Sequence, residues 1–138
     1  MKISSVLLFD NVGVYMHMLL MTIGLVMLLY MMLKINKPRI FYVTGTLALL
    51  PIIFSPTGFF YPIASIILVF ISFSFIENYL EDKNTKTLLV AIAFLFLLAG
   101  NVHFIFLTNH EVFYVLGHFL ELAAYILLLA NFLMVLKK

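Results

Sequence analysis

The side chains best suited to chemistry in this 138-residue chain are three histidines and a glutamate that stand inside apolar stretches. Glu121 follows His118 by three residues, so a helix would place the two side chains on one face. An imidazole beside a carboxylate suits a metal site, or a hydrogen-bonded pair in which the carboxylate orients the imidazole. The other two histidines of this kind are His17 and His103. These residue types predict a cofactor site, provided that the fold brings them together.

The composition places the chain among membrane proteins. Hydrophobic residues make up 65% of the sequence and charged residues only 10%, whereas soluble domains have about 45–50% and about 25%. A chain of this size cannot bury so much apolar surface in a core of its own. A soluble monomer and a disordered tail are therefore excluded, and the net charge of +2 is too small for a nucleic-acid binder. The lack of cysteine excludes disulfides, cysteine-type zinc sites and iron–sulfur clusters.

The lengths of the hydrophobic segments predict an all-α, polytopic membrane protein. A helix needs about 20 apolar residues to cross a bilayer, and four segments satisfy this easily. The stretch Ile40–Phe54 is ambiguous, because it is short and contains Pro51. With this stretch included, we predict a five-transmembrane-helix bundle that forms a single domain over residues 1–138. The predicted helices cover about 12–33, 39–55, 59–80, 87–107 and 112–136.

The distribution of basic residues decides between four and five crossings. Five helices place seven basic residues on one side of the membrane and only Lys2 on the other, whereas four helices split the same seven three against four. The positive-inside rule therefore favours five helices in the cytoplasmic membrane, with the N-terminus outside and the C-terminus in the cytoplasm. The seven residues are Lys34, Lys37, Arg39, Lys83, Lys86, Lys137 and Lys138.

Prolines and polar residues predict where the helices begin. Pro38 can open the second helix, because its missing N–H costs nothing there. Pro62 is expected in the first turn of the third helix, after a turn over residues 55–58. The polar loop that contains Asp82, Asn84 and Thr85 is expected to cap the fourth helix.

In this topology three histidines lie in one layer of the outer half of the bundle. His17 is about five residues into the first helix, His103 about four from the end of the fourth, and His118 about six into the fifth. At about 1.5 Å per residue, all three lie roughly 6–9 Å below the outer boundary. Glu121 lies slightly deeper. Ionisable groups inside a bilayer are costly and usually face the interior of the bundle, so this layer is the candidate site.

Three further residues belong to the surroundings of this layer. Met21 shares a helix face with His17, and Asn101 lies near the depth of His103, so both are predicted to support the site. His110 falls in the outer turn, where solvent is its expected partner. Any single histidine near a membrane boundary also has a purely structural interpretation, as a partner of headgroups or of backbone.

Two kinds of cofactor fit this set of residues. In the first hypothesis, haem b takes His17 and either His103 or His118 as axial ligands, and the chain transfers electrons as a small subunit of a respiratory or other membrane redox complex. In the second, His17, His103, His118 and Glu121 hold one Cu, Zn or Fe ion. An open position on that ion would make the chain a membrane-embedded, metal-dependent hydrolase.

A third hypothesis needs no cofactor. The predicted loops are too short to form a soluble catalytic domain, which favours a subunit of an enzyme complex over an enzyme that acts by itself. A non-catalytic accessory or assembly subunit is therefore an open alternative. No catalytic residue is assigned, and the expected partners are the lipid bilayer and other membrane-protein subunits.

Overall fold

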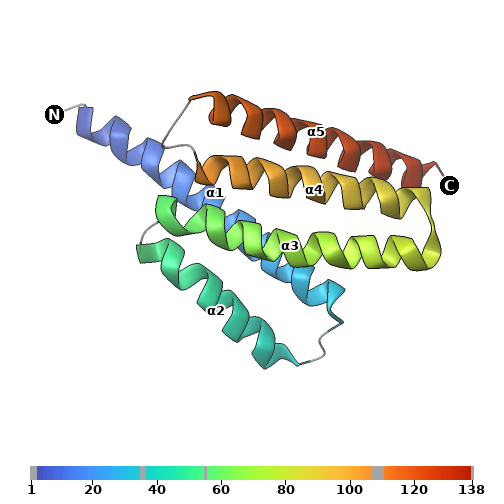
Figure 1. Ribbon diagram of the computed structural model, residues 1–138. Coiled ribbons are helices and arrows are strands. Elements are labelled where there is room, and N and C mark those ends of the chain that lie inside the picture. Colours follow the sequence, from blue (N-terminus) through green and yellow to red (C-terminus); the bar gives the residue numbers. More distant parts are fainter. Residues whose placement is uncertain (1–2, 35–36, 55, 107–110, 138) are drawn as a thin grey trace. The chain divides into compact units, whose positions relative to one another are not determined.

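The structure is a computed structural model, and all regular secondary structure among the residues that it describes is α-helical. These are residues 3–34, 37–54, 56–106 and 111–137, and no strand occurs among them. The predicted all-helical class is thereby confirmed. The helices (Figure 1) are α1 (Ile3–Met32), α2 (Pro38–Phe54), α3 (Pro56–Asp82), α4 (Thr85–Ile105) and α5 (Glu111–Leu136).

Four of the helices contain a stretch that is long and apolar enough to cross a membrane. They are α1, α3, α4 and α5, the helices in which the sequence predicts long spans. The stretches are Val12–Met32, Phe59–Asp82, Thr85–Ile105 and Val112–Leu136. The ambiguous stretch is also a helix, α2, but it has only 17 residues. The chain thus has the make-up of a multi-pass membrane protein.

The predicted start of the third helix is wrong. Helix α3 begins at Pro56, so no turn covers residues 56–58, and Pro62 lies inside the helix instead of in its first turn. The physical reason is that Pro56 itself suits the first helical position, and an apolar segment favours a backbone whose polar groups are bonded internally. Helix α1 begins at Ile3, and the part of it that is long and apolar enough to cross a membrane begins at Val12, close to the predicted start of the first span. Helix α2 begins at Pro38, as predicted.

Polar residues at the connections end and begin the helices. Asn84 caps α4, because its side-chain oxygen accepts a hydrogen bond of 3.0 Å from the backbone N–H of Lys86. The cap comes from the polar loop in which the sequence predicts it, and Asn84 is the residue of that loop that supplies it. Lys34 and Lys83 follow the ends of α1 and α3 with φ values of 48° and 46°, the left-handed conformation that stops a helix.

The chain divides into two compact units, residues 1–60 and 61–138, and the boundary falls within α3. In the first unit α1 and α2 form a hairpin, in which the rings of Tyr30 and Phe41 meet edge to face with centroids 5.3 Å apart. Thr22 is buried in α1 and satisfies its hydroxyl by donating to the Met18 carbonyl at 2.8 Å. The single domain expected over residues 1–138 stays a prediction.

The second unit contains the rest of α3 together with α4 and α5. The rings of Phe75 and Phe94 stack almost parallel between α3 and α4, with centroids 5.1 Å apart. Between α4 and α5, Lys86 donates from its ammonium group to the Met134 carbonyl at 3.1 Å. The stacked Phe75 and Phe94 rings thus connect α3 with α4, and the Lys86 hydrogen bond connects α4 with α5.

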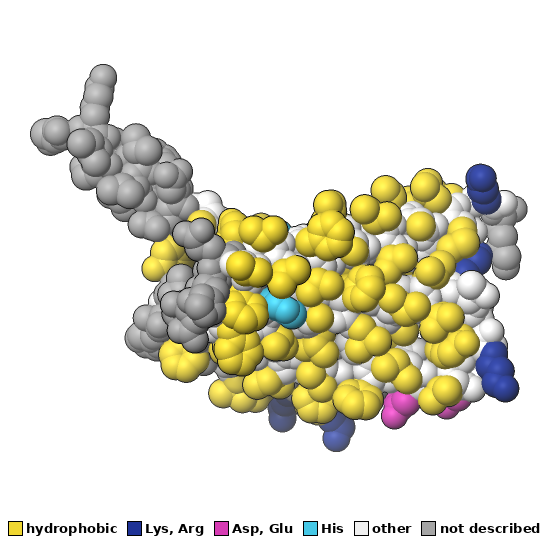
Figure 2. All heavy atoms as spheres, turned by 45° about the horizontal axis from the view of Figure 1, so that its top comes forward, with side chains coloured by type: hydrophobic (Ala, Val, Ile, Leu, Met, Phe, Trp, Pro, Cys, Tyr) yellow, Lys and Arg dark blue, Asp and Glu magenta, His cyan; other side chains and the backbone are white. Residues whose placement is uncertain are grey.

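The surface of the described helices is apolar. In Figure 2 hydrophobic side chains dominate the described surface, while lysine and arginine side chains gather at its margins. Helix α5 is the most outward-facing of the spans, with only 6% of its most apolar stretch buried. Such a surface suits contact with lipid hydrocarbon rather than with water.

Candidate cofactor site

A hydrogen bond between two side chains of α5 joins His118 to Glu121. Atom Nδ1 of His118 lies 3.2 Å from Oε2 of Glu121, one turn further along α5. The spacing of these residues predicts this hydrogen bond, and the structure contains it. Because a carboxylate oxygen only accepts, Nδ1 carries the proton, and the lone pair of a neutral ring is left on Nε2. The His118 side chain is 51% exposed and that of Glu121 is 19% exposed.

Aromatic rings enclose the His118 imidazole on two sides. Tyr114, one turn earlier on α5, meets it edge to face with centroids 4.4 Å apart. Phe104 reaches it from α4, with centroids 4.9 Å apart. From the sequence Tyr114 looks like part of the interfacial aromatic belt, and its contact with His118 was missed. The signal was present, because residues four apart on a helix are neighbours.

Glu121 also has tyrosines around it. Tyr61 on α3 and Tyr125 on α5 lie near its carboxylate. Tyr61 and Tyr125 were also missed as members of the site, although Tyr125 is one turn from Glu121 in the sequence.

His103 has a hydrogen bond of its own that also leaves the lone pair of the imidazole on Nε2. Its Nδ1 lies 2.7 Å from the backbone carbonyl oxygen of Ala99, one turn earlier on α4. A carbonyl only accepts, so Nδ1 donates and the lone pair of the neutral ring lies on Nε2. The ring is half-buried, with the Phe113 ring of α5 at a centroid distance of 5.9 Å. His103 and His118 thus each leave Nε2 as the ring nitrogen that can bind a metal.

Glycine contacts hold α4 and α5 together beside these histidines. A Cβ on Gly100 would lie 3.0 Å from the carbonyl oxygen of Gly117, and one on Gly117 would lie 2.7 Å from a ring carbon of Phe104. Any side chain at Gly117 would therefore displace the ring that packs on His118. Gly100 and Gly117 are small residues of the kind that lets membrane helices approach closely, and Gly117 stands directly before His118.

The predicted supporting residue Asn101 is almost fully buried, with 1% exposure. Its Nδ2 donates to the Leu97 carbonyl at 3.0 Å. Its Oδ1 has no hydrogen-bond partner among the described residues. Residues two apart on a helix do not face each other, so Asn101 does not share the face of His103.

His17 and Met21 belong to the first unit. His17 is exposed and Met21 is half-buried, one turn apart on α1. The positions of the two units relative to one another are not determined, so the meeting of His17 with His103 or His118 stays a prediction. His110 lies outside the described residues.

Within the part of the chain that the structure describes, no three His, Asp or Glu side chains lie close enough together to hold a metal ion. The mononuclear site of His17, His103, His118 and Glu121 stays a prediction. An axial pair on haem iron needs one imidazole from each side of the macrocycle, so it does not require three converging side chains.

Comparison with protein-family models, with curated proteins and with solved structures finds no match to this chain. The side chains described above are therefore the basis for a function.

Proposed function

We propose that this chain is a small membrane subunit that binds haem b through histidine Nε2 atoms and serves electron transfer within a larger membrane complex. The observation that supports this most is the pair of hydrogen bonds made by Nδ1 of His103 and of His118. Metal-bound histidines nearly always donate their other ring N–H to a carbonyl or a carboxylate. One of these two imidazoles is the proposed partner of His17 as an axial ligand.

The residues around His118 have distinct tasks in this proposal. Glu121 holds the ring in one tautomer and makes Nε2 a stronger donor. The Tyr114 and Phe104 rings fix the imidazole plane and supply an apolar wall. When bound, haem would supply reversible one-electron chemistry, with a potential set by the ligands and by the dry surroundings. The chain itself would supply position, basicity and the exclusion of water.

The proposal includes the membrane topology. The chain would cross the cytoplasmic membrane five times, with the N-terminus outside and the C-terminus in the cytoplasm. Support comes from the seven basic residues that five crossings gather on one side, and from the helical conformation of α2. At about 1.5 Å per residue its 17 residues extend roughly 25 Å. This is shorter than the hydrocarbon core of about 30 Å, but about 17 residues is the lower limit for a transmembrane helix.

Visible absorption of the chain, purified in detergent with its native partners, tests the cofactor. The proposal predicts a Soret band that shifts on reduction. Because helix α1 has no other histidine, His17→Ala should abolish or shift the band, and so should one of His103→Ala and His118→Ala. His110→Ala is the control and should leave the band unchanged. A band that survives His17→Ala intact would contradict the proposed ligation.

Elemental analysis of the same preparation separates the two remaining alternatives. Stoichiometric zinc, copper or iron without a Soret band would favour the mononuclear metal site, and with it the hydrolase hypothesis. A preparation with neither haem nor metal would leave the accessory subunit as the function. The outward-facing, apolar α5 would then be a natural surface for lipid or for a neighbouring subunit.

A further inference from the structure

An apolar groove runs between α1 and α2 in the first unit. Its volume is about 270 Å³. The hydroxyl groups in its lining belong to Tyr42 and Thr46, and Thr46 already donates to the Tyr42 carbonyl at 2.8 Å. The groove therefore offers hydrocarbon contact and almost no free hydrogen-bonding group. It is lined by Ile23, Val26, Phe41, Tyr42, Gly45, Thr46 and Leu49.

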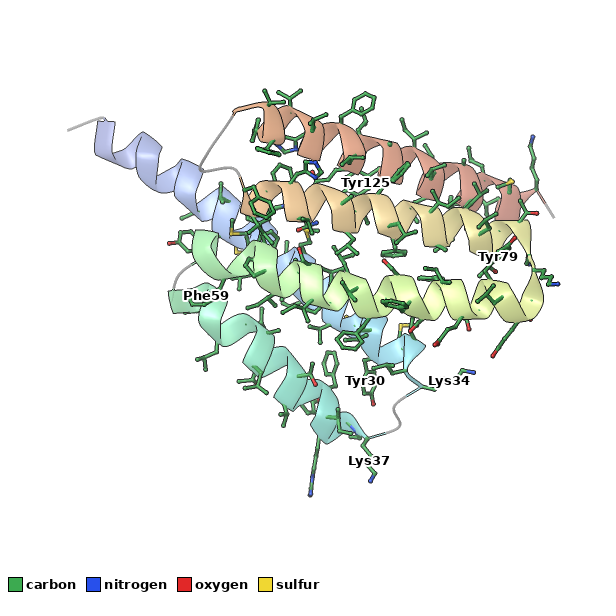
Figure 3. All side chains as sticks on the ribbon, in the orientation of Figure 1. Tyr30, Lys34, Lys37, Phe59, Tyr79 and Tyr125 are labelled. Carbon is green, nitrogen blue, oxygen red and sulfur yellow. The ribbon has the colours of Figure 1, made fainter. Side chains whose placement is uncertain are left out.

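Exposed cations stand at the end of the hairpin beside this groove. Lys34 follows α1, Lys37 precedes α2, and Arg39 is in the first turn of α2. Figure 3 shows Tyr30, Lys34 and Lys37 at this same end of the hairpin. Arg39 precedes Tyr42 by three residues and Thr46 by seven, so it lies on the face of α2 that forms the groove.

These cations have no acidic counterpart in the sequence around them. Residues 12–60 contain no aspartate or glutamate, while they contain all three of these basic residues. The connection between α3 and α4 is different, because Glu81 and Asp82 directly precede Lys83. The α1–α2 end therefore combines an apolar groove with positive charge that no acidic residue of 12–60 balances. This combination is complementary to a molecule with an anionic head and a hydrocarbon tail.

We propose that the α1–α2 groove binds an anionic phospholipid. One acyl chain would lie against Val26, Phe41 and Gly45, and the phosphate would face Lys37 and Arg39, with Lys34 nearby. Basic pockets between membrane helices bind anionic headgroups in this way. The inference stands on residues of the first unit alone and is independent of the cofactor proposed above.

The chain lacks tryptophan, which permits a direct test by fluorescence quenching. Tyr42→Trp places a single reporter at the groove, where Tyr42 is 67% exposed. The variant is reconstituted in bilayers that mix unlabelled phosphatidylcholine with bromine-labelled phosphatidylglycerol or bromine-labelled phosphatidylcholine. We expect the anionic lipid to quench this groove reporter with an apparent affinity about fivefold or more above that of the zwitterionic lipid.

The matched reporter is Phe132→Trp on α5, where Phe132 is 57% exposed. That helix ends at lysines too, and α4 beside it begins next to the acidic residues of the α3–α4 connection. We expect the α5 reporter to discriminate less between the two lipids than the groove reporter. Equal preference at both reporters would mean general surface attraction and would overturn the proposal.

Two sets of substitutions test the contacts of the lipid headgroup and of the acyl chain separately. Each set is made in the Tyr42→Trp variant. Lys37→Gln with Arg39→Gln should remove most of the preference for phosphatidylglycerol, whereas Lys83→Gln with Lys137→Gln should retain it. Gly45→Leu should fill the groove and weaken quenching by either lipid. Gly45→Ala should not, since its Cβ would only reach ordinary contact with Val26 at 4.0 Å. Quenching that persists in Gly45→Leu would show that no acyl chain occupies the groove.

Native mass spectrometry of the unaltered chain provides a readout that does not depend on the reporter substitution. We expect phosphatidylglycerol to remain bound at higher collision energy than phosphatidylcholine, and inorganic phosphate not to displace it. If inorganic phosphate alone displaced phosphatidylglycerol, the site would bind only the anionic group, and the groove would have no role in binding the acyl chain. Equal retention of both lipids would contradict the role of the cations.

Discussion

At the scale of single residues, the chemistry of His103 and His118 depends on what Nδ1 contacts. The bond from His118 to Glu121 was predictable, because residues three apart on a helix share a face. The bond from His103 to the Ala99 carbonyl was not, because it depends on a side-chain rotamer that the sequence does not specify. The contact of Phe104 with His118 was likewise hidden until α4 and α5 were placed side by side, whereas the contact of Tyr114 with His118 follows from their spacing of four residues on α5.

Replacing Glu121 by glutamine tests whether the carboxylate supports a ligand. Glutamine preserves the size of the side chain but removes the charge that strengthens Nε2 of His118. Loss of such a partner typically lowers metal affinity about 10–100-fold. We therefore expect Glu121→Gln to retain much less haem, measured as haem per protein after extended dialysis. Glu81→Gln, at an exposed position at the end of α3, is the control. Equal haem retention in both variants would argue against this role for Glu121.

At the scale of helices, hydrophobic length identifies the four long apolar helices, and Pro38 and Asn84 correctly predict two starts. The start of α3 was predicted wrongly because two prolines, Pro56 and Pro62, both suit a first turn. The local sequence does not show which of the two prolines starts the helix, because that depends on whether the residues between them are helical. The close approach of α4 and α5 at Gly100 and Gly117 needed the structure.

The α4–α5 contact predicts a strong effect of one methyl group. Gly117→Ala would place Cβ 2.7 Å from the Phe104 ring, so the ring or the helices must move. We expect a loss of about 1–3 kcal/mol in the free energy of unfolding, the usual cost of overpacking. Gly24→Ala is the matched control, because nothing lies within 4 Å of its Cβ. Unfolding in mixed micelles measures both variants, and equal stabilities would show that the contact does not constrain the helices.

At the scale of the whole molecule, composition and hydropathy indicate a membrane protein, and the apolar surface of the described helices fits that class. The number of crossings depends on α2, whose 17 residues are short for a span. The orientation of the helices in the membrane follows from how the basic residues are distributed between its two sides. This distribution can be read from the sequence, whereas the coordinates of the helices contain no membrane.

Single cysteines test the topology, because the chain has none of its own. Five crossings place the termini on opposite sides of the membrane. We expect Ser4→Cys to react with a membrane-impermeant maleimide on intact cells, and Lys138→Cys to react only after permeabilisation. Permeabilised cells carrying either cysteine control for its reactivity. Labelling of both cysteines on the same side would mean an even number of crossings, with α2 outside the set of spans.

The most direct test of the cofactor proposal is the electron paramagnetic resonance spectrum of the oxidised chain, purified with its native partners. Two imidazoles on ferric haem give a low-spin signal, and loss of one leaves a high-spin signal. We predict a stoichiometric low-spin signal that becomes high-spin in His17→Ala and stays low-spin in His110→Ala. A preparation without a haem signal, or a low-spin signal unchanged by His17→Ala, would contradict the proposal.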